Sequence, residues 1–364
     1  MKYSLLFILL LNIYYCQKEK ILEIRKQIEQ TNLKNIKNYP LITLGYITPW
    51  NKEGYDYVLK YSNKFDLICP TWFELKPEEI DGELQIILDG SNNVDSSYMK
   101  KLKNKNPNIL ILPRLHASFN DAKIFKVWLG KEADQFIKVL ERRIKYNNFD
   151  GFVLDSMYIW YDEDLLNKFI NNFLPKMYNL IKKLKKKLIV AIIPKYLRES
   201  KAKANKETFK KLAKYVDFIN IMTYDFGEYI GNNNKFYLGP ISWIKDCIDF
   251  YIDNNDKDRN IILKKILFGL SFHGFAYQNK NGTPVGTINS KEFITNLEQD
   301  ENNYIINYDE NEYEYYLSNN NDDIIAYPFI KFIEKRLEVS QELNLGGCGI
   351  WDIGNGKEGL LRPL

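Results

Sequence analysis

Short apolar runs alternate with longer amphipathic stretches along most of this chain, and this alternation restricts the possible folds. The amphipathic stretches predict helices near residues 54–62, 96–103, 121–146, 163–186, 206–214, 241–254 and 327–343. The apolar runs predict strands over Leu41–Ile47, Asp66–Cys69, Ile109–Pro113, Gly151–Asp155, Leu188–Ile193, Phe218–Met222, Ile266–Leu270 and Gly349–Asp352. Eight strands, nearly all separated by helices, predict an α/β fold in which a parallel sheet closes into a (β/α)8 TIM barrel.

The main alternative is an open, doubly wound sheet. That fold commonly carries a glycine-rich phosphate-binding turn after its first strand, and no such turn follows Leu41–Ile47. The chain has 364 residues, of which 45% are hydrophobic. This is enough to bury a barrel of about 250 residues together with extensions.

Two segments interrupt the alternation. In residues 73–93, apolar residues flank Asp81-Gly82, which predicts a hairpin after the second strand. Residues 275–326 predict a small α+β insertion between strand seven and the last long helix. Within them, Tyr308–Tyr316 is acidic and rich in tyrosine. We interpret this run as a solvated hairpin, and the alternative is one wall of a groove.

The N-terminal residues have the parts of a secretory signal peptide, predicted over residues 1–17. Lys2 supplies a positive start, Leu5–Ile13 an apolar core, and the following residues a cleavage region. The apolar core is shorter than the ~18 residues of a membrane-spanning helix, so no transmembrane helix is expected in the mature chain, although an uncleaved anchor is the alternative. Residues 18–40 predict a helical extension, and residues 41–364 the barrel.

The cysteines and histidines predict no metal site and no other cofactor. Removal of the signal peptide would leave Cys69, Cys247 and Cys348, an odd and widely spaced set that does not form a disulfide framework. We expect buried thiols. His116 and His273 have no accompanying cysteine cluster at ligand spacing.

The charge balance argues against a nucleic-acid partner, because 51 basic and 47 acidic residues give a net charge of only +4. The densest basic cluster, Lys182–Lys187, closes a helical pattern, and we expect a solvated helix end there. The alternative is a phosphate-binding patch. Asn281-Gly282-Thr283 is a glycosylation sequon whose use stays open, because Pro284 follows it.

The fourth strand carries the most direct information on function. Alternation along this strand places Val153, Asp155 and Met157 on one face, and Phe152 and Leu154 on the other. In a parallel barrel, the last inward position of a strand faces the mouth, where ligands bind. We expect Met157 there, and its thioether has no acidic proton to donate.

Several landmarks together resemble glycoside hydrolase family 18, and within it the chitinase-like, chitinase domain-containing group. The likeness spans roughly residues 41–364 and rests on the order and spacing of these short motifs. They are Gly45–Asn51, Phe149–Val153, Met222–Asp225, Pro240–Trp243, Phe268–Leu270 and Gly349–Gly354.

The resemblance implies a degenerate catalytic motif. Active members carry Asp-Gly-x-Asp-x-Asp-x-Glu, in which the Glu protonates the leaving oxygen and the N-acetyl carbonyl of the substrate acts as the nucleophile. On this chain, Asp150 and Asp155 match the first and third Asp, Val153 replaces the second, and Met157 replaces the Glu. We therefore expect no catalytic residues, with Asp155 either contacting sugar or remaining as an internal hydrogen-bonding relic.

The resemblance also implies residues that bind a ligand. Trp351 matches the family's Trp at the end of strand eight, which forms the floor of the sugar subsite. Tyr224 and Asp225 match residues that contact the acetamido group and the hydroxyls, and Tyr46 matches an aromatic beside the same subsite. Packing in the core is the alternative for Trp351 and Tyr46.

Other candidates follow from their positions after strands, since aromatic rings offer rigid contact area to the apolar faces of sugars. Trp50, Trp72 and Trp160 are expected at the rim or in a groove wall, with core packing as the alternative. Arg114 could meet an anionic sugar or form a structural ion pair. Glu74 is a weaker rim candidate.

These observations predict a secreted, non-catalytic chitinase-like lectin that binds an oligosaccharide or glycoconjugate in the C-terminal mouth of the barrel. The resemblance implies N-acetylglucosamine-type sugars or a bacterial glycolipid as ligand, and a location outside the cell, in the secretory pathway or in a lysosome-like compartment. One alternative is a weak or altered hydrolase that uses Asp155. Another is an interaction or trafficking partner with a vestigial groove. The sequence does not fix the oligomeric state.

Overall fold

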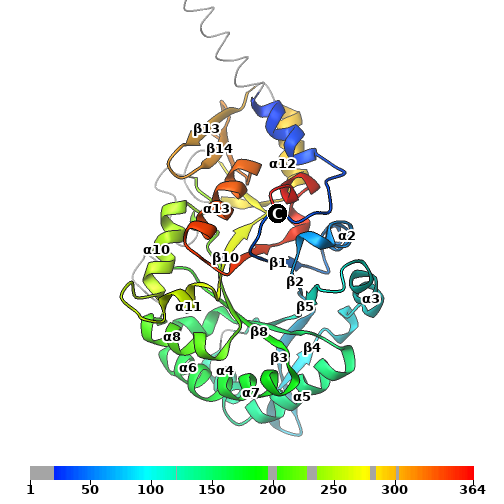
Figure 1. Ribbon diagram of the computed structural model, residues 1–364, viewed down its shortest axis with the longest axis vertical. Coiled ribbons are helices and arrows are strands. Elements are labelled where there is room, and N and C mark those ends of the chain that lie inside the picture. Colours follow the sequence, from blue (N-terminus) through cyan, green and yellow to red (C-terminus); the bar gives the residue numbers. More distant parts are fainter. Residues whose placement is uncertain (1–19, 120, 196–202, 228–235, 279–283, 301–302) are drawn as a thin grey trace, which may run out of the picture.

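A closed parallel barrel forms the body of the protein (Figure 1). The computed structural model describes residues 20–119, 121–195, 203–227, 236–278, 284–300 and 303–364. The signal peptide predicted over residues 1–17 and the sequon at Asn281 lie outside the described residues. The barrel strands are β1 (Ile42–Ile47), β2 (Leu67–Pro70), β3 (Phe73–Ile80), β5 (Leu110–Ile111), β6 (Arg114–Ala117), β7 (Gly151–Asp155), β8 (Lys187–Ile192), β9 (Phe218–Ile221), β10 (Ile266–Ser271) and β16 (Gly347–Trp351).

Two of the eight barrel strands are each broken into two pieces. β2 and β3 form the second strand, and β5 and β6 form the third, interrupted at Pro113, which has no backbone N–H to donate. Across the gap, Leu112 N donates to Ile68 O at 2.9 Å and Val153 N donates to Pro113 O at 3.1 Å. β6 pairs in parallel with both β3 and β7, which closes the ring. The predicted (β/α)8 barrel is confirmed.

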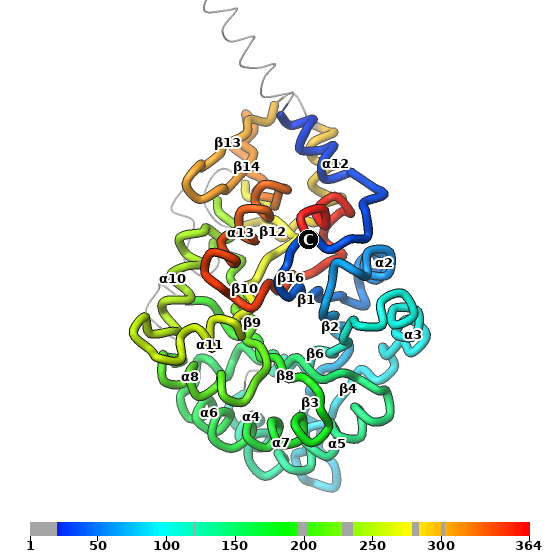
Figure 2. The backbone as a smooth tube through the Cα atoms, viewed as in Figure 1, coloured from blue at the N-terminus to red at the C-terminus, as the bar shows by residue number. Residues whose placement is uncertain are grey.

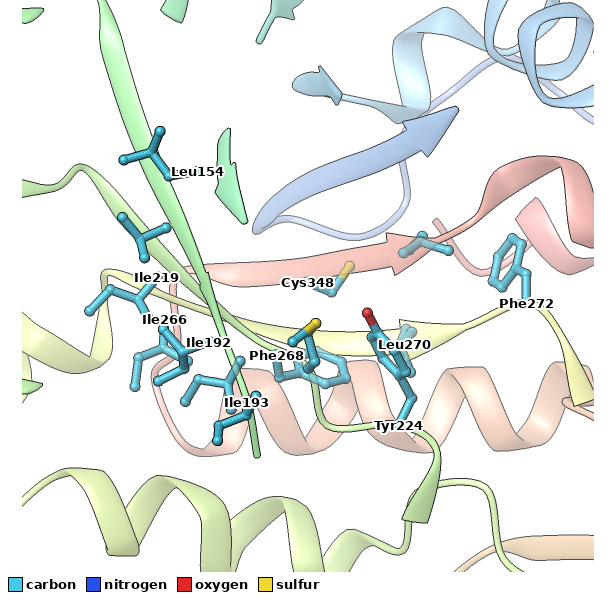
Figure 3. Packing of buried hydrophobic residues seen from close by; sticks show 14 of the residues in the cluster. Leu154, Ile192, Ile193, Ile219, Tyr224, Ile266, Phe268, Leu270, Phe272 and Cys348 are labelled. Atoms are coloured by element: carbon cyan, nitrogen blue, oxygen red, sulfur yellow. The ribbon is translucent and has the colours of Figure 1, made fainter. Parts of the chain in front are cut away.

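Both faces of the strands are apolar because one face fills the barrel and the other packs against helices. The interior cluster comprises Leu44, Tyr46, Leu67, Cys69, Leu112, Val153, Ile189 and Leu267. The outer cluster contains Phe152 and Leu154, so β7 alternates as its sequence predicts. Figure 3 shows part of this outer layer, which includes Leu154, Ile219, Phe268 and Leu270.

The helices surround the barrel (Figure 1). They are α2 (Glu53–Lys60), α3 (Ser96–Lys105), α4 (Ala122–Leu129), α5 (Ala133–Asn147), α6 (Glu163–Lys168), α7 (Leu174–Leu184), α8 (Lys206–Tyr215), α10 (Ile241–Tyr251), α11 (Arg259–Leu263) and α13 (Ile330–Glu342). The helix expected over 121–146 divides at Gly130, where a Cβ would lie 2.5 Å from Lys126 O. The helix expected over 163–186 contains a π-helical segment, Phe169–Phe173, between α6 and α7.

The predicted insertion is a five-stranded antiparallel sheet with one helix, at one end of the molecule (Figure 2). Its elements are β11 (Gly274–Tyr277), β12 (Pro284–Ile288), α12 (Ser290–Asp300), β13 (Ile305–Asp309), β14 (Glu314–Ser318) and β15 (Ile324–Ala326). The tyrosine-rich run forms the β13–β14 hairpin. An N-terminal helix over residues 20–29 contacts α12 through Arg25 Nη2 and Glu298 Oε1, 2.5 Å apart.

A buried ion pair joins the insertion to the barrel helices. Arg336 on α13 lies 2.8 Å from Glu314 on β14, and both side chains are fully buried. Glu314 also accepts hydrogen bonds from the backbone N–H groups of Leu238 and Gly239, and Arg336 donates to Gly239 O. Both charges are therefore satisfied by hydrogen bonds, as buried charges require.

The predicted hairpin after the second strand consists of β3 and β4 (Glu83–Asp89). Ile80 pairs with Glu83, so Asp81 and Gly82 are the two turn residues, with φ angles of 53° and 78°. Two successive positive φ values are typical of the tight turn whose twist matches that of an antiparallel pair. Because β3 also pairs with β6, the hairpin extends a barrel strand beyond the ring.

The three described cysteines are free and buried, as predicted. Burial raises the pKa of the Cys247 and Cys348 thiols to about 12. Within the part of the chain that the structure describes, no helix is long and apolar enough to cross a membrane.

Candidate functional site

A cleft of about 580 Å³ lies beside the carboxyl ends of the first barrel strands. It is bordered by the turn after β1, the β2–β3 junction, the β3–β4 hairpin, β6 and the end of β16. The lining residues are Pro49, Trp50, Thr71, Trp72, Phe73, Glu74, Lys76, Asp89, Gly90, Asn92, Asn93, Arg114, His116 and Trp351. Its volume lies in the range of ordinary small-ligand sites.

Arg114 lines this cleft and contacts three other side chains, those of Asp155, Trp351 and His116. Its Nε donates to Asp155 Oδ2 at 2.7 Å, and Nη2 also contacts that oxygen. The guanidinium carbon lies 5.0 Å from the ring centroid of Trp351, a cation–π distance. Nη2 is also 3.1 Å from His116 Nδ1. Burial opposes the charge of Arg114 and the Asp155 carboxylate favours it, with the net effect that the pKa of Arg114 is raised.

Asp155 is buried behind Arg114, with which it forms an ion pair, and it is not itself among the residues that line the cleft. Parallel pairing places Asp155 opposite His116, so the three polar side chains meet through the register of β6 and β7. Oδ2 contacts both guanidinium nitrogens, whereas Oδ1 is buried with no hydrogen-bond partner among the described residues. A salt-bridged carboxylate accepts hydrogen bonds and has no proton to donate.

Met157 lies two residues beyond the end of β7 and not on the strand itself. β7 ends at Asp155, and Met157 begins a short 3-10 helix, Met157–Tyr161, with 39% of its surface exposed. The residues that line the described cleft do not include it. The two-residue alternation stops where the strand stops, so Met157 is no longer an inward strand position.

Asp150 has a structural role at the opposite end of the barrel. Its Oδ2 accepts hydrogen bonds from Ile111 N at 2.9 Å and Lys103 Nζ at 2.8 Å. It thus ties the start of β7 to β5 and α3. Val153, the other departure from the motif, fills the barrel interior.

Trp351, Tyr46 and Trp50 form the aromatic part of the site. Trp351 is partly buried, and its ring centroid is 5.5 Å from that of Tyr46 in an edge-on contact. Tyr46 is buried inside the barrel beneath this contact. Trp50 is 69% exposed and is the large hydrophobic residue that projects from the cleft rim.

Two of the expected rim aromatics belong to the core. Trp72 borders the cleft, but it is only 1% exposed and its Nε1 donates to Tyr55 Oη at 2.8 Å. Trp160 is 3% exposed and packs edge-on against Phe169. For both tryptophans the burial agrees with core packing, the alternative to a place at the rim or in a groove wall. Trp128 on α4 and Trp243 on α10 are also buried.

Tyr224 and Asp225 lie together at the end of β9. Tyr224, labelled in Figure 3, is buried, and its ring centroid lies 6.3 Å from that of His273 in an edge-on arrangement. Asp225 has a left-handed backbone, with φ of 60°, and its Oδ1 is 2.8 Å from His273 Nε2. Neither residue is among those lining the cleft around Trp351.

The β3–β4 hairpin supplies cleft residues that the sequence reasoning largely missed. Glu74 was a weak candidate, and Lys76 and Asp89 were not candidates. Lys76 Nζ is 2.7 Å from Asp89 and 3.4 Å from Glu74, which also accepts a hydrogen bond from Ser118 at 2.5 Å. The signal was available, because a hairpin that continues a barrel strand must border the mouth. His116 was considered only as a metal ligand.

Comparison with known proteins identifies the family. The profile described as "Glycosyl hydrolases family 18" matches residues 42–356. The chain belongs to this family. It is 22% identical to human "Chitinase-3-like protein 2" over 309 residues, which cover 75% of this chain and 76% of that protein.

Solved structures of the family share the fold. A chitinase from Chromobacterium violaceum superposes with a TM-score of 0.70 at 14% identity, covering 88% of this chain and 96% of that one. A structure titled "Human YKL-39 is a pseudo-chitinase with retained chitooligosaccharide binding properties" gives a TM-score of 0.65 at 17% identity, covering 89% and 98%. Proteins described as a chitinase and as a pseudo-chitinase therefore share this fold, so the fold alone does not distinguish the two functions.

Proposed function

We propose that this family 18 protein is a non-catalytic lectin that binds an oligosaccharide or glycoconjugate in the cleft around Trp351. The observation that carries the proposal is the position of Arg114. Its guanidinium lies against the Trp351 ring and pairs with Asp155. The one carboxylate that β7 offers near the cleft is therefore engaged in an ion pair, where general acid catalysis requires a proton donor within reach of the leaving oxygen.

The same cleft has the chemistry of a sugar site. Exposed Trp50 and partly exposed Trp351 supply apolar ring faces, and Glu74, Lys76, Asp89 and Asn93 supply charged and amide groups for hydroxyls. Rigid aromatic rings give contact area at low entropic cost, and a few polar groups then orient the ligand. N-acetylglucosamine oligomers are the proposed ligand class, and the chitooligosaccharide binding described for human YKL-39, which shares this fold, supports it.

Calorimetric titration with chitotetraose tests the binding. We expect saturable binding that weakens about tenfold or more in Trp50→Ala, since a rim aromatic contributes its contact area directly. Tyr146→Ala is the matched control, because Tyr146 is 86% exposed on α5 and outside the cleft. Equal loss in both variants, or no binding to the wild-type protein, would contradict the proposal. A parallel titration with glycolipid-containing vesicles tests whether the protein binds a glycoconjugate.

A hydrolase that uses Asp155 is the second candidate, because Asp155 Oδ1 has no partner among the described residues. Incubation with a fluorogenic chitotriose distinguishes the two functions. We expect no turnover above background. Turnover that disappears in Asp155→Asn would replace the lectin with an enzyme, and biological function that survives Trp351→Ala would favour an interaction or trafficking partner.

We further propose that the chain enters the secretory pathway through its N-terminal segment. The apolar core over Leu5–Ile13 supports this route. Expression in cultured cells followed by N-terminal sequencing of the protein in the medium tests it. A start near residue 18 is expected, and retention of the full chain in the cytosol would contradict it.

A further inference from the structure

A second cavity lies at the opposite end of the barrel from the sugar cleft. It has a volume of about 600 Å³ and is formed where β8, β9 and β10 begin and where α7 and α8 end. Six lysines line it: Lys182, Lys185, Lys186, Lys187, Lys214 and Lys265. Asp217 is the one acidic residue among its lining residues.

Three of these lysines are engaged by groups at the cavity wall. Lys187 Nζ is 2.8 Å from Asp217 Oδ1. Lys265 Nζ donates to Ala213 O at 2.6 Å and Val216 O at 2.9 Å, which caps the end of α8. Lys186 Nζ is 3.7 Å from Asp150, whose other oxygen is already held by Lys103.

The other three lysines have no carboxylate partner among the described residues. Lys182 Nζ lies 5.5 Å from the ring centroid of Tyr178, and Lys185 and Lys214 are exposed at the cavity edge. The carboxyl ends of α7 and α8 each contribute roughly half a negative charge. The six lysine charges are therefore opposed by the carboxylates of Asp217 and Asp150 and by the two helix ends. An excess of about three positive charges remains around one concave surface.

This excess has an electrostatic consequence inside the cavity. Burial lowers the pKa of Lys265, the Asp217 carboxylate raises it, and the ammonium groups of Lys182 and Lys187 lower it, with a net lowering. A bound anion would relieve this repulsion. Lysine ammonium groups recognise phosphate or sulfate as point charges, and several of them around one concave surface favour a ligand with more than one such group.

We propose that this lysine cavity binds a small molecule that carries two or more tetrahedral oxyanion groups, phosphate or sulfate. The rings of Tyr178 and Tyr215, whose centroids are 5.8 Å apart, border the same cavity and offer apolar contact to the remainder of the ligand. The site is separate from the sugar cleft and does not depend on the proposed lectin function.

Calorimetric titration of the full chain with inorganic tripolyphosphate and with sucrose octasulfate, in near-physiological salt, tests the proposal. Saturable binding to one site is expected for at least one probe, and the tighter probe identifies phosphate or sulfate as the favoured group. In Lys182→Glu/Lys214→Glu, binding should weaken by roughly tenfold or more, because two nearby charges are reversed. Both lysines are exposed, so the fold should persist.

The matched control is Lys100→Glu/Lys101→Glu, which makes the same charge change at two exposed positions on α3. It should bind both probes like the wild-type protein. The milder pair Lys182→Gln/Lys214→Gln should also weaken binding, and chitotetraose binding should be unchanged in all these variants. Failure of both probes to saturate, or equal weakening in the α3 control, would overturn the proposal.

Discussion

Arg114 and Asp155 give the sharpest test of how the site is built. Their side chains are only 14% and 8% exposed, and they meet at 2.7 Å. Two unit charges about 4 Å apart attract by about 4 kcal/mol at an effective dielectric of 20, which is offset by the cost of removing both from water. Removal of one partner leaves the other charge buried. We therefore expect Arg114→Met to lower the free energy of unfolding by about 3–5 kcal/mol.

Replacement of both partners should restore much of this loss. In Arg114→Met/Asp155→Asn no buried charge remains, so the free energy of unfolding should lie well above the value expected from adding the two single losses. Urea unfolding of the four proteins, followed by circular dichroism, measures this coupling. A loss below about 1 kcal/mol in Arg114→Met, or strict additivity in the double variant, would refute the view that Arg114 neutralises Asp155.

Three further predictions concern catalysis, the insertion and pH. Met157→Glu should not create efficient chitotriose hydrolysis, because Met157 lies on a 3-10 helix beyond the end of β7; efficient turnover would contradict this placement. Arg336→Met should destabilise the fold by about 3–5 kcal/mol in urea unfolding, since it leaves Glu314 buried without its ion partner, and a change near zero would contradict that role. Burial and then Arg114 lower the pKa of His116 below 6.5, so the folded protein keeps this ring neutral where the unfolded chain protonates it. Stability should therefore fall as the pH drops below 6.5, and His116→Gln should reduce that fall in unfolding measured between about pH 7 and 5; an unchanged slope would contradict it.

The barrel could be predicted from sequence because several of its strands, such as β7, β8 and β10, are buried and largely apolar on both faces. Gly151–Asp155 was predicted with the bounds that the structure has. The β3–β4 hairpin was predictable because Asp81-Gly82 satisfies a local backbone requirement that few other residue pairs meet. Patterns of this kind depend only on residues that are close in the chain, so they can be recognised in a single sequence.

The site was harder to predict because its contacts depend on register and on where strands end. The meeting of Arg114 with Asp155 follows from the pairing of β6 with β7, which no local pattern specifies. Alternation placed Met157 inward, but it contains no information on the residue at which β7 stops. Trp72 and Trp50 both follow strands, and only the packing of neighbouring helices decides that one is buried and the other exposed.

The continuation of a barrel strand into the β3–β4 hairpin fixes the shape that the cleft would present to the proposed ligand. The wall that carries Glu74 and Lys76 is hydrogen-bonded to the ring through Phe73, Glu74 and Leu75, which pair with β6. This wall of the cleft is therefore preorganised, and binding would cost the protein little conformational entropy. If the cleft binds as proposed, selection among ligands would depend on their fit to this hairpin, and lengthening or shortening β3 and β4 should change that selection.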